Sequence, residues 1–192
     1  MRAVADWLIA RAQKTPYSHL EREDGRIYMR RFWLVPYDYI PSFGPIGCGP
    51  VGWIRPIAKI LQLAGIAIRI HHIMEADRDR HMHDHPWWWI SIVLRGSYVE
   101  ITPNPDGAEV WPTTASEPVL GHIRHTGSIA IKRPTDRHKI AVVPPGGVWT
   151  LFITGPKRQE WGFYTETGKV HHRQYGGSAH IQHQEHQEES GT

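Results

Sequence analysis

From residue 66 onward, hydrophobic and polar residues alternate with a period of two, which is typical of β-strands whose two faces meet different surroundings. Ile66, Ile68 and Ile70 fall on one face of the first such strand, and Arg69 and His71 fall on the other. The sequence predicts further strands in 81–102, with a turn near Gly96, and at 119–123, 128–133, 138–143, 148–154 and 160–164. Many short strands separated by Gly- and Pro-rich turns indicate a β-sandwich or β-barrel.

Two short helices are predicted before this β-rich region. Residues 3–14 repeat apolar positions at helical spacing, which predicts an N-terminal helix. A second helix is expected at 56–64, and its buried stripe is predicted to be formed by Ile57, Ile60 and Leu61. The chain is therefore expected to be mainly β, with two short helices before the barrel.

The chain is expected to divide into three parts. Residues 1–65 combine the two helices with a strand at 26–35 and a Pro- and Gly-rich loop at 36–53, interpreted as a strap over the barrel or as a functional lid. Residues 66–175 form the barrel. Residues 176–192 have almost no apolar content, so this tail is expected to be disordered and dispensable for folding.

Composition and charge narrow the class of protein. The chain has 192 residues, of which 40% are hydrophobic, which suits one domain with a real core. The net charge of +3 without a basic run gives no indication of nucleic-acid binding. No stretch reaches 18 apolar residues, no secretory signal is visible, and Cys48 is the single cysteine. We therefore expect a soluble cytoplasmic protein that does not contact membranes, and the sequence leaves a homodimer open.

Among the 14 histidines, a few have spacing that points to a metal site. His83 and His85 are two residues apart, so a strand would direct both imidazoles to one side. His138, at the start of an apolar strand, is the best candidate for a third ligand. Three imidazoles suit Fe, Zn, Ni or Mn and leave coordination positions for water or substrate.

These residues resemble the two motifs of the cupin family. His83-x-His85 followed by an apolar strand ending at Gly96 is similar to the first motif, and Gly127, Pro134 and His138 are similar to the second. The resemblance covers roughly residues 66–165 and implies a single-domain jelly-roll barrel with one divalent metal ion.

Two finer resemblances concern the segment H-D-H-P-W and the following S-x-V-L-R-G-x-Y-x-E. They are similar to the thiol dioxygenases, which implies ferrous iron, and to uncharacterised cupins of bacteria and their phages. Most cupins add a glutamate ligand where this chain has Trp89 or Ile90, so three histidines alone are expected. Thiol dioxygenases carry a late His and Tyr where this chain has Phe152 and Thr154, so an enzyme of this kind is expected to be a weak or inactive cysteine dioxygenase.

Residues near the metal supply the candidate chemistry. Arg69 and Arg95 could hold a carboxylate through paired hydrogen bonds. Tyr98 or Tyr164 could act as a proton donor. For the other polar residues and the tryptophans the sequence predicts supporting roles: His71 and His72 as lining candidates, His81 as a surface residue, Asp84 as a turn cap, Glu100 as a solvated strand residue, and Trp87, Trp88 and Trp89 as stacking or core residues.

The sequence therefore favours a metal-dependent enzyme acting on a small polar molecule, either dioxygenase-like or an isomerase or lyase. Iron is the first expectation, with Zn, Ni or Mn as alternatives. A small-ligand-binding module without catalysis and a phage or prophage accessory protein are the competing interpretations.

Overall fold

The computed structural model describes residues 2–15, 19–22, 24–35, 55–79, 81–104 and 118–175. The predicted loop at 36–53 and the predicted tail at 176–192 lie outside the described residues. Within the described ranges, no helix has the length and apolar character that a membrane crossing needs.

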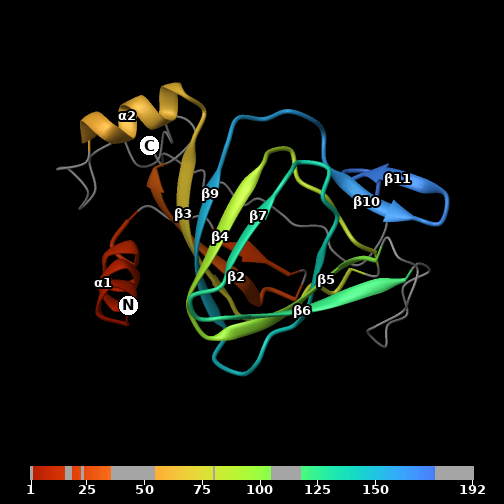
Figure 1. The fold of residues 1–192 in the computed structure, drawn as a ribbon, viewed down its shortest axis with the longest axis horizontal. Helices are drawn as coiled ribbons and strands as arrows, with labels where there is room; N and C mark the ends of the chain where they lie inside the picture. The colour runs from red at the N-terminus through yellow and green to blue at the C-terminus, as the bar shows by residue number, and fades with distance from the viewer. Residues whose placement is uncertain are drawn as a thin grey trace, which may run out of the picture.

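The larger of the two main sheets has six strands, in the order β1-β2-β3-β9-β4-β7 (Figure 1). Neighbouring strands are antiparallel throughout. The strands are β1 (Leu20–Glu21), β2 (Ile27–Val35), β3 (Ala67–Ile73), β9 (Val148–Thr154), β4 (Trp89–Arg95) and β7 (Ile129–Lys132).

The smaller sheet has the order β6-β5-β8, with β6 (Val119–His125), β5 (Ser97–Pro103) and β8 (Lys139–Val142). An isolated antiparallel bridge between His83 and His138 adds the segment around His83 beside the start of β8. From β4 onward the chain passes back and forth between the sheets, with β5, β6 and β8 in the smaller sheet and β7 and β9 in the larger one, as in a jelly roll. The structure confirms the predicted mainly β, single-domain fold with its strands arranged as in a jelly roll.

Both predicted helices are present, as α1 (Arg2–Ala12) and α2 (Arg55–Leu63). Ile9 and Ala12 of α1 pack against Phe32, Ile70 and Trp149 on the outer face of the large sheet.

The predicted buried stripe of α2 is wrong for two of its three residues. Ile57 is 58% exposed and Ile60 is 66% exposed, whereas Ala58 is buried. Helical periodicity identifies side chains that share a face, but it does not show which face is covered. Here the helix buries the side that carries Ala58 and leaves Ile57, Ile60 and Leu63 exposed, whereas Leu61 is half-buried.

A hairpin that the sequence predicted only in part projects from one end of the barrel (Figure 1). It consists of β10 (Gly162–Thr165) and β11 (Gly168–His171), and β11 was not predicted. Phe163 bridges to His83, and the ring of Tyr175 stacks on Phe163 with centroids 4.0 Å apart. The hairpin therefore lies directly beside the histidine segment.

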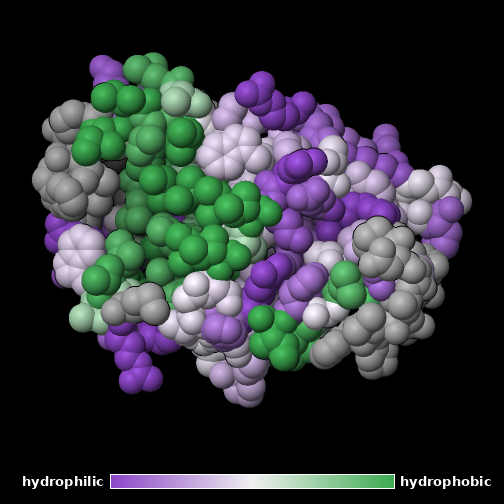
Figure 2. All heavy atoms as spheres, in the orientation of Figure 1, coloured by the Kyte–Doolittle hydropathy of each residue, from purple (hydrophilic) through white to green (hydrophobic). Residues whose placement is uncertain are grey.

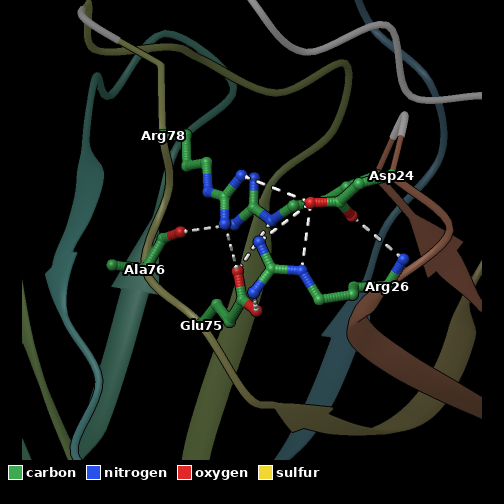
Figure 3. A network of polar contacts seen from close by, with 6 residues as sticks. Asp24, Arg26, Glu75, Ala76 and Arg78 are labelled. Carbon is green, nitrogen blue, oxygen red and sulfur yellow. Dashed lines mark hydrogen bonds and ion pairs between the residues drawn. The ribbon is translucent and has the colours of Figure 1, made fainter.

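A network of ion pairs joins the turn before β2 to the segment after β3 (Figure 3). Glu75 accepts from Arg22 at 2.8 Å and from Arg26 and Arg78 at 3.3 Å. Asp24 pairs with Arg26 at 2.9 Å. Apart from Arg22 the cations are exposed, so the network contributes modestly to stability, and its ion pairs connect Asp24 and Arg26 to Glu75 and Arg78.

Candidate metal centre

Backbone pairing brings the three predicted metal ligands together from two distant segments. His83 and His138 exchange two backbone hydrogen bonds, with N to O distances of 3.0 and 2.9 Å. The amide of His85 donates to the carbonyl of Pro134 at 3.2 Å. His83 and His85 are two positions apart in this extended segment, so their side chains project from the same side, toward His138.

The three imidazole rings converge on one small space. Ring centroids are 5.2 Å apart for His83 and His85, and 5.0 Å apart for each of them and His138. Nε2 of His85 lies 2.8 Å from Nε2 of His138. One nitrogen from each ring lies within 4.8 Å of the other two, so a single ion could contact all three.

The protonation states of the rings suit metal binding. Burial, together with the neighbouring His138, lowers the pKa of His83 to about 4. Burial also holds the pKa of His85 well below its usual range. Both rings are therefore neutral near pH 7, and neutral imidazole is the form that binds a metal. Nδ1 of His83 is buried without a hydrogen-bond partner, an uncommon situation that a bound ion would relieve if it were held at that atom.

A buried carboxylate stands behind His138. Oε1 of Glu100 lies 3.0 Å from Nδ1 of His138, while Nε2 of the same ring faces His85. Arg124 donates twice to Oε2 of Glu100, at 2.9 and 2.7 Å, and Nζ of Lys132 lies 3.5 Å from Oε1. A carboxylate on the far nitrogen of a ligating histidine fixes the orientation of the ring and raises its basicity.

The prediction that Glu100 is a solvated strand residue is wrong, because its side chain is fully buried. Burial by itself would raise the pKa of this carboxyl. The contact with His138 and the positive charges of Lys132 and Arg124 outweigh burial and hold the pKa far below its usual range. Glu100 is thus a stable anion inside the barrel.

Asp84 is also fully buried, which corrects its predicted role as a turn cap. Its carboxylate accepts hydrogen bonds from the side chains of Gln159 at 2.8 Å, Tyr164 at 2.9 Å and Lys169 at 2.6 Å, and from the amide of Gly162 at 2.9 Å. The side chain of Asp84 points to the opposite side of the extended segment from His83 and His85. Its bonds tie the histidine segment to the β10–β11 hairpin.

The two tyrosines predicted as proton donors occupy different places. The hydroxyl of Tyr164 donates to Asp84, and burial together with this bond raises its pKa to about 12. Tyr98 is buried in the interior cluster with Val93 and Ile140, where burial raises its pKa above the usual range. Tyr164 is therefore engaged by Asp84, and Tyr98 faces the barrel interior.

The two arginines predicted to hold a carboxylate are also separated. Arg69 is buried inside the barrel, with its guanidinium 4.8 Å from the ring centre of Trp33 and 5.3 Å from that of Phe152. Arg95 is exposed and pairs with Asp6 of α1, so it lies outside the site.

Three further histidines of the sequence prediction lie either beside the metal ligands or apart from them. We call the metal ligands His83, His85 and His138 the triad. His71 is buried inside the barrel and stacks on Phe152 with centroids 4.6 Å apart. His72 points to the outer face, where it stacks on Trp149 at 4.1 Å. His81 is hydrogen-bonded to Tyr175 at 2.9 Å and is not part of the triad.

The interior next to the triad combines polar and aromatic side chains. Burial lowers the pKa of His71 well below its usual range, with the nearby Arg69 adding to the effect, and both residues also lower the pKa of His85. Nε2 of His71 and Oγ1 of Thr150 are buried without hydrogen-bond partners. Five aromatic rings lie against the ligands or close behind them: Trp87, Trp89, Phe152, Trp161 and Phe163.

The described residues include a second group with metal-binding side chains, formed by Glu160, His171 and His172 on the hairpin. The contacts of these side chains within the protein account for their arrangement without a bound ion. Nδ1 of His171 accepts from the amide of Arg173 at 3.2 Å, and its Nε2 faces Glu160 at 3.4 Å. Glu160 is exposed and also pairs with Lys157. The chemistry of the donors and their burial therefore favour the triad.

Metal-free protein is expected to lose stability as the pH falls from about 7 toward 4. In the unfolded chain histidines titrate near 6.5, whereas folded His83 titrates near 4 and His71 and His85 lie well below 6.5. The unfolded state therefore binds more protons in this range. Asp79 has the opposite effect on the pH dependence of stability, because burial raises its pKa to about 6. This single carboxyl is outweighed by the three histidines.

Urea unfolding of metal-free protein at pH 7, 6 and 5 measures this effect. A midpoint that stays constant or rises as the pH falls would contradict buried neutral histidines. In the variant His71→Phe the dependence on pH should be shallower, because one of the three groups is gone.

Neither a protein-family model nor a curated protein matches the sequence. Among solved structures, the chain is similar to a cupin-like protein from Thermotoga maritima, with a TM-score of 0.44 and 12% identity over 87% of this chain and 97% of that chain. It is also similar to vicilin from Corylus avellana, with a TM-score of 0.47 and 10% identity over 78% of this chain and 35% of that chain. For Fe(II)-HppE the TM-score is 0.44 and the identity 11%, over 75% of this chain and 57% of that chain.

The chain thus spans 57% of the length of HppE and 35% of the length of vicilin. Because all three TM-scores are below 0.5, the fold assignment is based on the strand order. Strand order and the three histidines together define a jelly-roll barrel with a candidate metal centre at one end of its smaller sheet.

Proposed function

We propose that this protein is a metal-dependent enzyme that acts on a small polar molecule and holds one divalent ion through His83, His85 and His138. The observation that carries the proposal is the convergence of these three imidazole rings, with the buried anion Glu100 beside Nδ1 of His138. Three protein ligands leave coordination positions open, as a catalytic ion requires. Iron is the first candidate, and Zn, Ni and Mn also bind imidazole.

When bound, the ion would supply Lewis-acid or redox chemistry. The residues of the chain would bind and orient the substrate. Arg69, buried beside the triad, would attract a carboxylate or another anionic group. The unpartnered nitrogen of His71 would give or accept a hydrogen bond from the same molecule. The aromatic rings would keep water away from the reacting groups.

The resemblance to thiol dioxygenases supports iron but not cysteine as the substrate. Phe152 stacks on His71, and Thr154 is fully buried, at the positions where that family carries His and Tyr. An apolar ring cannot move a proton. We therefore propose a substrate other than cysteine.

A non-catalytic module that binds a small ligand is the second candidate. The specific observation in its favour is that tryptophan rings lie against the metal ligands. The ring centroids are 5.1 Å apart for Trp89 and His138 and 6.4 Å apart for Trp87 and His85. Aromatic faces of this kind can hold a planar or sugar-like ligand without converting it.

Oxygen consumption and product formation by iron-loaded protein, with cysteine, 3-mercaptopropionate and a panel of small acids and sugars, distinguish these proposals. We expect turnover of a small carboxylic acid and little or none of cysteine. Arg69→Met should reduce that turnover by at least about 100-fold, whereas the matched variant Arg95→Met should leave it unchanged. Saturable binding of a panel member without turnover would favour the binding module, and rapid turnover of cysteine would overturn the substrate proposal.

A further inference from the structure

The outer face of the large sheet is apolar where a solvent-facing antiparallel sheet normally carries polar residues. The polar positions point inward instead: Arg69, Ser91 and Thr150 are all buried in the barrel. The neighbouring outward positions of the same strands are mostly isoleucine and leucine. This inverted alternation indicates that something covers the outer face.

Strand register places the outward side chains in two rows. The first row crosses four strands as Ile68, Ile153, Ile90 and Ile131, each paired with the next. It contains neither a charge nor a polar group. Ile131, on the edge strand β7, is 72% exposed.

The second row runs parallel to the first and consists of Ile70, Leu151, Ile92 and Ile129. Helix α1 covers the end of this row at Ile70. At the other end, on β7, Ile129 is 57% exposed. The cluster under α1 also includes Leu151 of β9 and Leu94 of β4, so the covering ends before the edge strand β7.

Helix α2 extends the apolar surface with its outward residues Ile57, Ile60 and Leu63. Figure 2 shows a continuous hydrophobic patch that runs from α2 across the strands β9, β4 and β7. We call the two rows together with these α2 residues the apolar face. Its five most exposed residues offer roughly 600 Å², close to the ~800 Å² that each partner buries in a standard interface. That area is at the upper end of the largest apolar patch on a typical monomer, about 300–600 Å², and patches of this size often mark interaction sites.

We infer that the apolar face is the interface between two copies of this chain. Two-fold symmetry would place like against like, so uncharged aliphatic rows would meet uncharged aliphatic rows and leave no buried charge unpaired. The net charge of +3 is small enough that repulsion between copies is weak. With the half-exposed residues of the two rows included, the area approaches what each partner of a stable dimer buries, and the inference does not depend on the metal or the proposed function.

Sedimentation or light scattering of the full chain tests this interface. The wild type should have twice the mass of one chain at about 10 µM. The double variant Ile129→Lys/Ile131→Lys should weaken dimerisation at least ~100-fold and run as a monomer at that concentration. The matched control Ile123→Lys changes a residue that is 70% exposed on β6 of the other sheet, and it should remain dimeric.

Thermal melting shows whether each variant is folded, and exposed substitutions should leave the melt unimpaired apart from the loss of dimerisation. A wild type that is monomeric even at about 100 µM would overturn the inference and indicate that another segment or another partner covers the face. A double variant that stays dimeric would also overturn it, because the contact would then lie elsewhere.

Discussion

Replacing Glu100 with alanine is expected to lower the free energy of unfolding by about 3–5 kcal/mol, the usual effect of removing one partner from a buried ion pair. Arg124 and Lys132 are largely buried and would lose their shared carboxylate. His138 would lose the anion beside its Nδ1, so metal affinity should fall by about 10–100-fold. Urea unfolding measures the first effect and competitive metal titration the second.

Two variants separate these effects. Glu100→Gln keeps the shape and one acceptor oxygen, so it should retain more stability than Glu100→Ala while still lowering metal affinity. Glu160→Ala removes an exposed carboxylate that also pairs with a lysine and a histidine, and it should cost less than about 1 kcal/mol. Equal losses of stability for Glu100→Ala and Glu160→Ala would contradict the role assigned to the buried network.

Replacing Asp84 with alanine is expected to cost about 1–3 kcal/mol, because the buried amide of Gly162 would lose its acceptor, whereas the other partners can still reach water. Lys169 and Tyr164 would lose their shared oxygen, and the hairpin would lose its link to the histidine segment. Chemical denaturation measures the loss. The control Asp24→Ala removes an exposed carboxylate that pairs with Arg26, and it should change stability by less than about 1 kcal/mol. A stable Asp84→Ala variant would mean that the hairpin docks by its aromatic contacts alone.

Much of the fold could be predicted because hydrophobic and polar residues alternate with a period of two along its strands. The strand of residues 66–73 was assigned with Arg69 and His71 on one face, and the structure places both inside the barrel. Alternation does not show which face is the interior, however, since here the isoleucines face outward. The same ambiguity explains why Ile57 and Ile60 of α2 were expected to be buried.

The candidate site could be predicted where its residues are close in the sequence or follow a known motif. His83 and His85 show their common direction by their spacing, and His138 was found through the second cupin-like motif. Glu100 and Asp84 were missed because a lone carboxylate in a strand is usually solvated, and their cationic partners Arg124, Lys132 and Lys169 come from distant segments. The one available signal was that Glu100 shares the face of Tyr98.

Metal content of the purified full chain, measured by elemental analysis after dialysis, tests the central proposal most directly. The wild type should hold about one equivalent of Fe, Zn, Ni or Mn, and His83→Ala/His85→Ala should hold almost none, because two of three ligands are gone. His171→Ala/His172→Ala, a matched pair of histidines on the hairpin, should retain the full equivalent. Full metal content in the His83→Ala/His85→Ala variant would contradict the assignment of the metal centre.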